Sequence, residues 1–169
     1  PAARTLAGMT RAPSAGQLMA RLLRTRWLMR LPIGLFRSGL GWVLGPRLLM
    51  IEHLGRRSGK PRYVVVEVLE RGPGRFIVAS GFGPGAQWYQ NLRANYVAYL
   101  STGLIRRARA HPRFLEEQES RGVLEEYGAA HPRAYRILRE AMGRLQDGYP
   151  HIPLVEFTPK AALGGLPLA

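Results

Sequence analysis

The segment HLGRRSGKPRYVVVEVL, residues 53–69, sets four basic side chains around Ser58 and Gly59 and continues into a run of valines. Aliphatic and β-branched residues dominate 47–54 and 61–70, and a glycine lies in the connection, so the two runs are predicted to pair as a β-hairpin. Like charges at one hairpin tip repel each other unless an anion neutralises them. The segment therefore predicts both a sheet and a binding site for an anionic ligand.

The pattern on the C-terminal side of this hairpin predicts further strands and helices. After a turn at RGPG come a strand at 75–80, a glycine-rich loop at 81–87, a short helix at 88–95 and a second hairpin from strands at 96–101 and 104–110. From Glu116 onward the apolar residues follow helical spacing, and two helices are expected to meet at His131 and Pro132. A final strand is predicted at 151–159. Because strands outnumber crossover helices, we expect the α+β class, with a small, mostly antiparallel barrel and helices packed on it.

The chain of 169 residues is expected to form one folded domain, residues 47–157, between a basic N-terminal helical arm, 1–46, and a tail, 158–169. In the arm, Trp27 and several leucines lie among arginines, which is compatible with an amphipathic helix up to Pro32. Such a helix is typical of proteins that bind an anionic membrane surface, but packing on its own domain explains the pattern equally well. Nucleic acid is a weaker candidate, because no recognised binding motif accompanies the charge.

The composition favours anionic partners and excludes cysteine chemistry. There are 25 basic and 11 acidic residues, with a net charge of +14, and no acid occurs before Glu52 or between Arg71 and Leu115. The absence of cysteine excludes disulfides, thiolate metal sites and a cysteine nucleophile. Arginines interrupt the longest apolar region before it could span a bilayer, and no apolar core typical of a signal peptide is present. We therefore predict a cytoplasmic location, with peripheral attachment to the inner membrane face as an alternative.

Several common catalytic motifs are excluded. Residues 55–61 resemble a Walker loop, but the glycine spacing is one residue short, and Pro61 stands where Ser or Thr would hold magnesium. Gly81, Gly83 and Ala86 match the dinucleotide-binding fingerprint, yet no acid lies about 20 residues further on to bind a ribose. The four histidines lack the spacing of a metal site, so no metal is expected. Ser80 lacks the nucleophile elbow of hydrolases.

The remaining features suit a long ligand with a heterocyclic head and an anionic tail. Guanidinium groups at the hairpin tip can bind phosphate and carboxylate. Backbone N–H groups of the glycine loop and the amide of Asn91 can bind the polar edge of a ring, and Trp88 offers an apolar wall.

Three segments carry a resemblance to a known family: GRRSGKPR at 55–62, VASGFGPGAQWYQNLRAN at 78–95 and EEYGAAHPRAYRILREAMG at 125–143. Through them, residues 21–159 resemble the deazaflavin-dependent nitroreductase and F-420H2-dependent quinone reductase family. The resemblance implies a split β-barrel similar to FMN-binding barrels. It also implies the 8-hydroxy-5-deazaflavin coenzyme F-420, whose tail is a phosphate followed by glutamates. The implied reaction is hydride transfer from C5 of the reduced coenzyme to an electron-poor acceptor such as a quinone or a nitro compound.

The resemblance also assigns site residues by position. The hairpin residues that would hold the anionic tail or shape its turn are Arg56, Arg57, Ser58, Gly59, Lys60 and Arg62. The residues that would surround the deazaflavin ring are Ser80, Gly81, Phe82, Gly83, Trp88, Asn91 and Leu92. Of these, Ser80 is the expected catalytic residue, because its hydroxyl could supply the proton that accompanies the hydride, with solvent as the alternative donor.

The acceptor pocket departs from the pattern of the nitroimidazole-reducing members. Where those members have tyrosines, the corresponding positions here are His131, Ala134 and Ile137. Tyr127, His131 and Tyr135 are therefore the expected pocket residues, although either tyrosine could equally be a core aromatic. Two further interpretations stay open: an FMN- or haem-binding split-barrel protein, with FMN as the alternative cofactor, and a non-catalytic basic module that binds anionic lipid or nucleic acid.

Overall fold

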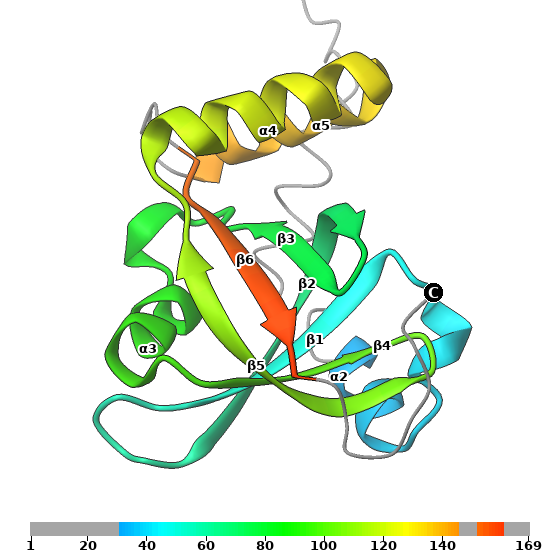
Figure 1. The fold of residues 1–169 in the computed structure, drawn as a ribbon, viewed down its shortest axis with the longest axis vertical. Coiled ribbons are helices and arrows are strands. Elements are labelled where there is room, and N and C mark those ends of the chain that lie inside the picture. Colours follow the sequence, from blue (N-terminus) through cyan, green and yellow to red (C-terminus); the bar gives the residue numbers. More distant parts are fainter. Residues whose placement is uncertain (1–30, 146–151, 161–169) are drawn as a thin grey trace, which may run out of the picture.

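The structure is a computed structural model that describes residues 31–145 and 152–160, so residues 1–30 of the arm, with its expected amphipathic helix, and residues 161–169 of the tail lie outside the described residues. Six antiparallel strands form a closed barrel in the order β1-β2-β3-β6-β5-β4 (Figure 1). The strands are β1 (Leu48–Leu54), β2 (Pro61–Gly72), β3 (Arg75–Ala79), β4 (Ala98–Thr102), β5 (Ile105–Phe114) and β6 (Leu154–Pro159). The predicted α+β class with an antiparallel barrel is confirmed.

Hairpins between neighbouring strands build most of the barrel, as the turn signals predict. In the first hairpin His53 lies opposite Arg62 and Leu54 opposite Pro61, so the basic turn joins the ends of β1 and β2. The strand β6 then pairs with both β3 and β5, with Phe76 opposite Phe157, and so closes the barrel. Closure gives each of these six strands a paired neighbour on both sides.

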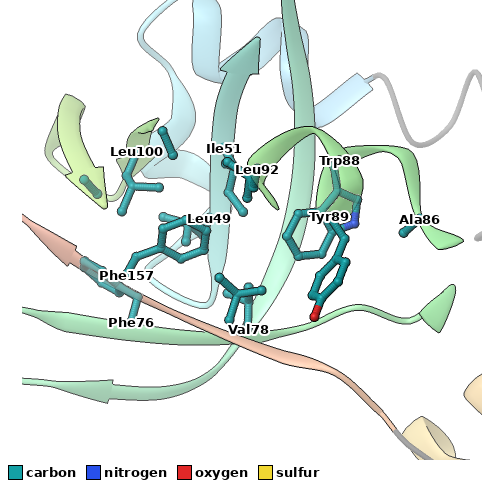
Figure 2. Close-up of a cluster of buried hydrophobic side chains, with 13 residues drawn as sticks. Leu49, Ile51, Phe76, Val78, Ala86, Trp88, Tyr89, Leu92, Leu100 and Phe157 are labelled. Atoms are coloured by element: carbon teal, nitrogen blue, oxygen red, sulfur yellow. The ribbon is translucent and has the colours of Figure 1, made fainter. Parts of the chain in front are cut away.

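Alternation along the strands separates the barrel interior from its outer face. Leu49 and Ile51 of β1 point inward to a buried cluster with Phe76, Leu100 and Phe157 (Figure 2). Between them, Met50 points outward and packs with Phe36 and Val65. The outer cluster anchors α2 (Leu31–Arg37) and the short 3-10 helix η1 (Gly41–Leu44) on the barrel wall.

The helix α3 (Gln87–Asn95) follows the glycine-rich loop and its 3-10 turn η2 (Gly83–Gly85). Trp88, Tyr89 and Leu92 are buried and belong to the same cluster as the interior residues of the barrel (Figure 2). Trp88 and Tyr89 meet edge to face, with ring centroids 6.0 Å apart. The helix is thereby anchored to the barrel core, which fixes the position of its N-terminal residues.

The helices α4 (Glu117–Ala130) and α5 (Pro132–Leu145) pack across the end of the barrel opposite to the β1–β2 turn (Figure 1). A capping box between Glu116 and Glu119 starts α4, and Pro132 occupies the first position of α5. Leu124 packs with Ile77 and Leu154 in a second buried cluster. None of the helices described is long and apolar enough to cross a membrane.

Candidate functional site

A cavity of about 800 Å³ lies between the β1–β2 turn, the glycine-rich loop and α3. Its walls combine basic, polar and apolar side chains from four segments. The residues lining it are His53, Gly55, Arg56, Arg57, Ser58, Arg62, Tyr63, Val64, Phe82, Gly85, Ala86, Gln87, Trp88 and Asn91.

The backbone of the β1–β2 turn holds its basic side chains at the rim of this cavity. The N–H of Gly55 donates to the carbonyl of Lys60 at 2.9 Å, and the N–H of Gly59 donates to the carbonyl of Gly55 at 2.8 Å. Gly59 has φ +63°, a left-handed conformation that glycine adopts without steric cost. These backbone bonds close the turn without using its basic side chains.

The basic side chains of the turn have no acidic partner among the residues that the structure describes. Within residues 31–145 and 152–160, no carboxylate forms an ion pair with Arg56, Arg57, Lys60 or Arg62. Five arginines elsewhere do pair with glutamates: Arg47, Arg75, Arg107, Arg113 and Arg121. Uncompensated cations at one concave site attract and orient anions, and guanidinium groups bind phosphate or carboxylate with two parallel hydrogen bonds. The rim of the cavity is therefore an anion-binding surface.

Arg56 is the cation whose position the protein fixes most closely. Its backbone N–H and its Nη1 both donate to Oδ1 of Asn91, at 3.1 and 2.9 Å. Nη1 also donates to Oε1 of Gln87 at 3.1 Å. Asn91 is 6% exposed and Gln87 lies one helical turn before it on α3, so the helix holds this guanidinium on the cavity wall.

His53, the last buried residue of β1, is a cavity residue that sequence reasoning missed. Its side chain is 4% exposed, and Nδ1 lies 3.3 Å from Nδ2 of Asn91. Burial lowers the pKa of His53 and the nearby Arg62 lowers it further, against an opposing effect of a backbone hydrogen bond at Leu54. The histidine is therefore neutral at physiological pH.

The glycine-rich loop is tied to the barrel through Ser80. The hydroxyl of Ser80, fully buried, donates to the carbonyl of Gly83 at 2.7 Å, and the backbone N–H of Ser80 donates to the carbonyl of Pro153 at 2.9 Å. Farther along, Nε2 of Gln90 donates to the carbonyl of Pro84. The loop thus carries Phe82 to the cavity, where its ring is 43% exposed.

The structure brings most of the predicted coenzyme residues to one place. Seven of them line the cavity: Arg56, Arg57, Ser58, Arg62, Phe82, Trp88 and Asn91. The others support it from the same segments: Gly59, Lys60, Ser80, Gly81, Gly83 and Leu92. Sequence reasoning missed Tyr63, Val64 and Gln87 as well as His53. Strand alternation was the available signal for His53, because it places this residue on the same face as Leu49 and Ile51.

The predicted acceptor residues do not line this cavity. Tyr127 is buried on α4, its ring centroid is 5.2 Å from that of His131, and Tyr135 packs on α5 near Gly128. Burial raises the pKa of Tyr127, and the charge of Glu67 raises it further. Glu67 lies five residues beyond Arg62 on β2, about 16 Å along the strand. The structure therefore places the tyrosines in the helical layer, away from the cavity.

The sequence profile of a family described as F420H(2)-dependent quinone reductase matches residues 34–127, more than half of the chain. The chain belongs to this family. Membership makes it an oxidoreductase and implies coenzyme F420 as its cofactor, in agreement with the resemblance seen in the sequence. The matched range contains every residue that lines the cavity.

Of three solved structures that resemble this chain, the two with TM-scores of 0.50 or more share its fold. A protein described as a domain-swapped dimer is 22% identical, with a TM-score of 0.52 and with 79% of this chain and 98% of that one covered. A protein of unknown function from Agrobacterium tumefaciens is 13% identical, with a TM-score of 0.50 over 78% of this chain and 56% of that one. An F420-H2 dependent reductase is 22% identical over 66% of this chain and 93% of that one, with a TM-score of 0.47. No curated protein matches the chain significantly.

The donor set of the cavity fits the coenzyme of this family. A rim of guanidinium groups that form no ion pair with a carboxylate among the described residues suits a tail of phosphate and carboxylates. Beyond the rim, Trp88, Phe82 and Val64 supply apolar surface for a flat ring, and Asn91 lies beside Trp88 on the inner face of α3.

Proposed function

We propose that this protein reduces a quinone with a hydride from reduced coenzyme F420, and that the coenzyme binds in the cavity between the β1–β2 turn and α3. The observation that carries the proposal is that one cavity combines an apolar wall with basic side chains that have no acidic partner in the part of the chain that the structure describes. When bound, the coenzyme supplies the hydride from its deazaflavin ring. The protein supplies position and electrostatics.

The basic turn binds and orients the anionic tail. Arg57 and Arg62 line the cavity and have no carboxylate partner among the residues described, so they are the principal ligands of the tail. Arg56, held by Asn91 and Gln87, presents a third guanidinium at a fixed position. Trp88 and Phe82, which line the cavity, would supply the apolar surface against which the ring binds.

Proton delivery is assigned to solvent. A quinone that accepts a hydride also takes up a proton to become the quinol. Ser80, the residue expected to donate that proton, has its hydroxyl proton in a bond to the Gly83 carbonyl, and Ser80 does not line the cavity. We therefore assign Ser80 a positioning role in the glycine-rich loop, and leave the proton to water that enters with the acceptor.

The test measures coenzyme binding and a single turnover separately. Replacing Arg57 and Arg62 together with Ala is expected to raise the Kd for coenzyme F420 at least tenfold, about 1.4 kcal/mol, because two charged contacts are lost at a partly solvated rim. Arg121→Ala, on α4, is the matched control and should leave the Kd unchanged. Stopped-flow mixing of the reduced protein–coenzyme complex with menadione should show rapid oxidation.

Two outcomes would contradict the proposal. An unchanged Kd in the double variant would remove the turn from the coenzyme site. Oxidation by a nitro compound with none by menadione would replace the quinone with a nitro acceptor.

A further inference from the structure

His53 is a buried, ionisable residue that lines the cavity, and the proposed hydride transfer assigns no role to it. Its neighbour Asn91 accepts two hydrogen bonds from Arg56, one from the backbone N–H and one from Nη1. Because both of those atoms are donors, the atom of Asn91 that faces them must be its oxygen. The amide nitrogen, Nδ2, therefore faces His53.

This orientation determines where the proton of His53 resides. Nδ2 of Asn91 is a donor, and it lies 3.3 Å from Nδ1 of His53. Nδ1 must then be the unprotonated acceptor, so neutral His53 carries its proton on Nε2. A chain of oriented hydrogen bonds thus runs from His53 through Asn91 to Arg56.

Charges around His53 oppose its protonation. Arg62 lies opposite His53 in the β1–β2 pairing, and Arg56 and Arg57 of the turn line the same cavity. The nearest acid along the chain, Glu52, points to the other face of β1, where Arg107 binds both of its carboxylate oxygens at 2.8 and 2.9 Å. From α3, the facing groups are the neutral amides of Gln87 and Asn91, and from β4 the residue opposite is Ala98.

We infer that His53 is a positioning residue: in its neutral form it holds the amide of Asn91 so that Asn91 fixes Arg56 on the cavity wall, and protonation of His53 releases Arg56 and weakens coenzyme binding. The inference deepens the proposed function and rests on it for the identity of the ligand. A protonated His53 presents an Nδ1–H donor to the Nδ2 donor of Asn91. The repulsion between these two donors is relieved when the Asn91 amide rotates. The amide nitrogen of Asn91 then faces the N–H groups of Arg56, which have lost their acceptor.

The direction in which coenzyme affinity changes with pH distinguishes this mechanism from simple charge attraction. A protonated histidine beside an anionic tail would bind the tail more tightly at low pH. The Asn91 mechanism gives the opposite sign: below the lowered pKa of His53 the coenzyme binds more weakly, by at most tenfold per pH unit for one linked proton.

The first experiment uses the full chain without coenzyme. Nitrogen-15 NMR of the histidine side chains should show His53 neutral, with the proton on Nε2, at pH about 7 and titrating below the usual histidine range. Asn91→Asp should raise the pKa of His53, because a carboxylate beside Nδ1 favours the protonated ring. A proton on Nδ1 of neutral His53, or an unchanged titration in Asn91→Asp, would overturn the inference.

The second experiment measures the Kd for oxidised coenzyme F420 from pH about 7.5 to about 5. His53→Asn places an acceptor oxygen near the position of Nδ1 without a titratable ring, so it should bind within about threefold of the unaltered protein at pH 7.5 and lose the pH dependence. His111→Asn, exposed on β5, is the control and should keep it. The ionisation of the coenzyme itself is common to all three proteins and cancels in the ratios.

The results have separate meanings. Tighter binding at low pH in the unaltered protein than in His53→Asn would overturn the inference in favour of direct charge attraction. Absence of coenzyme binding to the unaltered protein at every pH would contradict the proposed function instead, and the NMR measurement would then decide the hydrogen-bond assignment alone.

Discussion

Ser80 shows how the role of a residue near the site depends on the hydrogen bonds that surround it. The family resemblance assigns Ser80 to the surroundings of the deazaflavin ring, with its hydroxyl as the expected proton donor. In the structure that hydroxyl, fully buried, donates to the carbonyl of Gly83, while the N–H of Gly83 donates to the carbonyl of Ser80 at 2.9 Å. The two residues close a small turn, so Ser80 shapes the loop.

Replacing Ser80 by Ala should therefore affect stability more than chemistry. The buried Gly83 carbonyl would lose a hydrogen-bond donor, so we expect the free energy of unfolding to fall by about 1–3 kcal/mol in urea denaturation. The matched control is Ser38→Ala, where an exposed hydroxyl makes the same kind of bond to the carbonyl of Leu35, and there a change below about 0.5 kcal/mol is expected.

Single-turnover oxidation of the coenzyme by Ser80→Ala decides between the two roles. Retention of the rate within a few fold, with a lowered stability, supports a positioning residue. A loss of rate above about a hundredfold with unchanged stability would make Ser80 the proton donor after all.

Other residues of the site show which contacts a local sequence pattern can predict and which it cannot. The spacing of three between Trp88 and Asn91 is typical of residues on one helical face, and both line the cavity. The spacing of the four histidines along the chain does not indicate a metal site, so the sequence gives His53 no role. Its partner Asn91 is 38 residues away, and only the closed barrel with α3 against its core brings the two together.

At the scale of elements, the periodicity of apolar residues predicts the strands and helices well. It does not predict which elements pack against one another. The two hairpins and the helix at 87–95 follow from alternation and turn residues. The same signals do not predict that this helix inserts Trp88, Tyr89 and Leu92 into the barrel core. An apolar helix face indicates that the helix packs against something, but it does not identify the packing partner. For the same reason, Tyr127 and Tyr135 could be assigned to a pocket or to the core with equal weight, and the structure places them in the helical layer.

The helix α4 offers a matched test of how it packs on α5. A Cβ added at Gly122 would meet no atom within 4 Å, whereas one added at Gly128 would lie 2.8 Å from Cδ1 of Tyr135. Gly122→Ala should raise the free energy of unfolding by about 0.5–1 kcal/mol, through helix propensity alone. Gly128→Ala should be less stable than Gly122→Ala by about 1–3 kcal/mol, because the Tyr135 ring must move. Equal gains in both variants, measured by urea denaturation, would show that α5 does not pack on α4 at this point.

At the scale of the whole molecule, an excess of positive charge was evident from composition, but its placement depends on pairing across the barrel. Arg47 pairs with Glu67, Arg75 with Glu70, and Arg113 with both Glu119 and Glu156. Arg47 and Glu67 are 20 positions apart and Arg113 and Glu156 are 43 apart, so no short window of sequence reveals these two pairs. They pair part of the positive charge on the barrel wall and at the start of α4, whereas within residues 31–145 and 152–160 the basic side chains of the β1–β2 turn form no ion pair with a carboxylate.

That distribution predicts how salt acts on coenzyme binding. With a net charge of +14, the whole molecule attracts a polyanion, and the turn adds short-range contacts. Raising the salt from about 0.05 M to about 0.5 M should raise the Kd for coenzyme F420, because screening shortens the range of exposed charges to a few ångströms. Arg57→Ala should show a smaller salt dependence, since one screened contact is already gone. Arg121→Ala, with a guanidinium side chain 68% exposed and paired to Glu117, removes the same charge far from the cavity and should keep the full dependence. If both variants lost salt dependence equally, net charge rather than the turn would account for the affinity, and a salt-independent Kd in the unaltered protein would contradict an electrostatic tail site altogether.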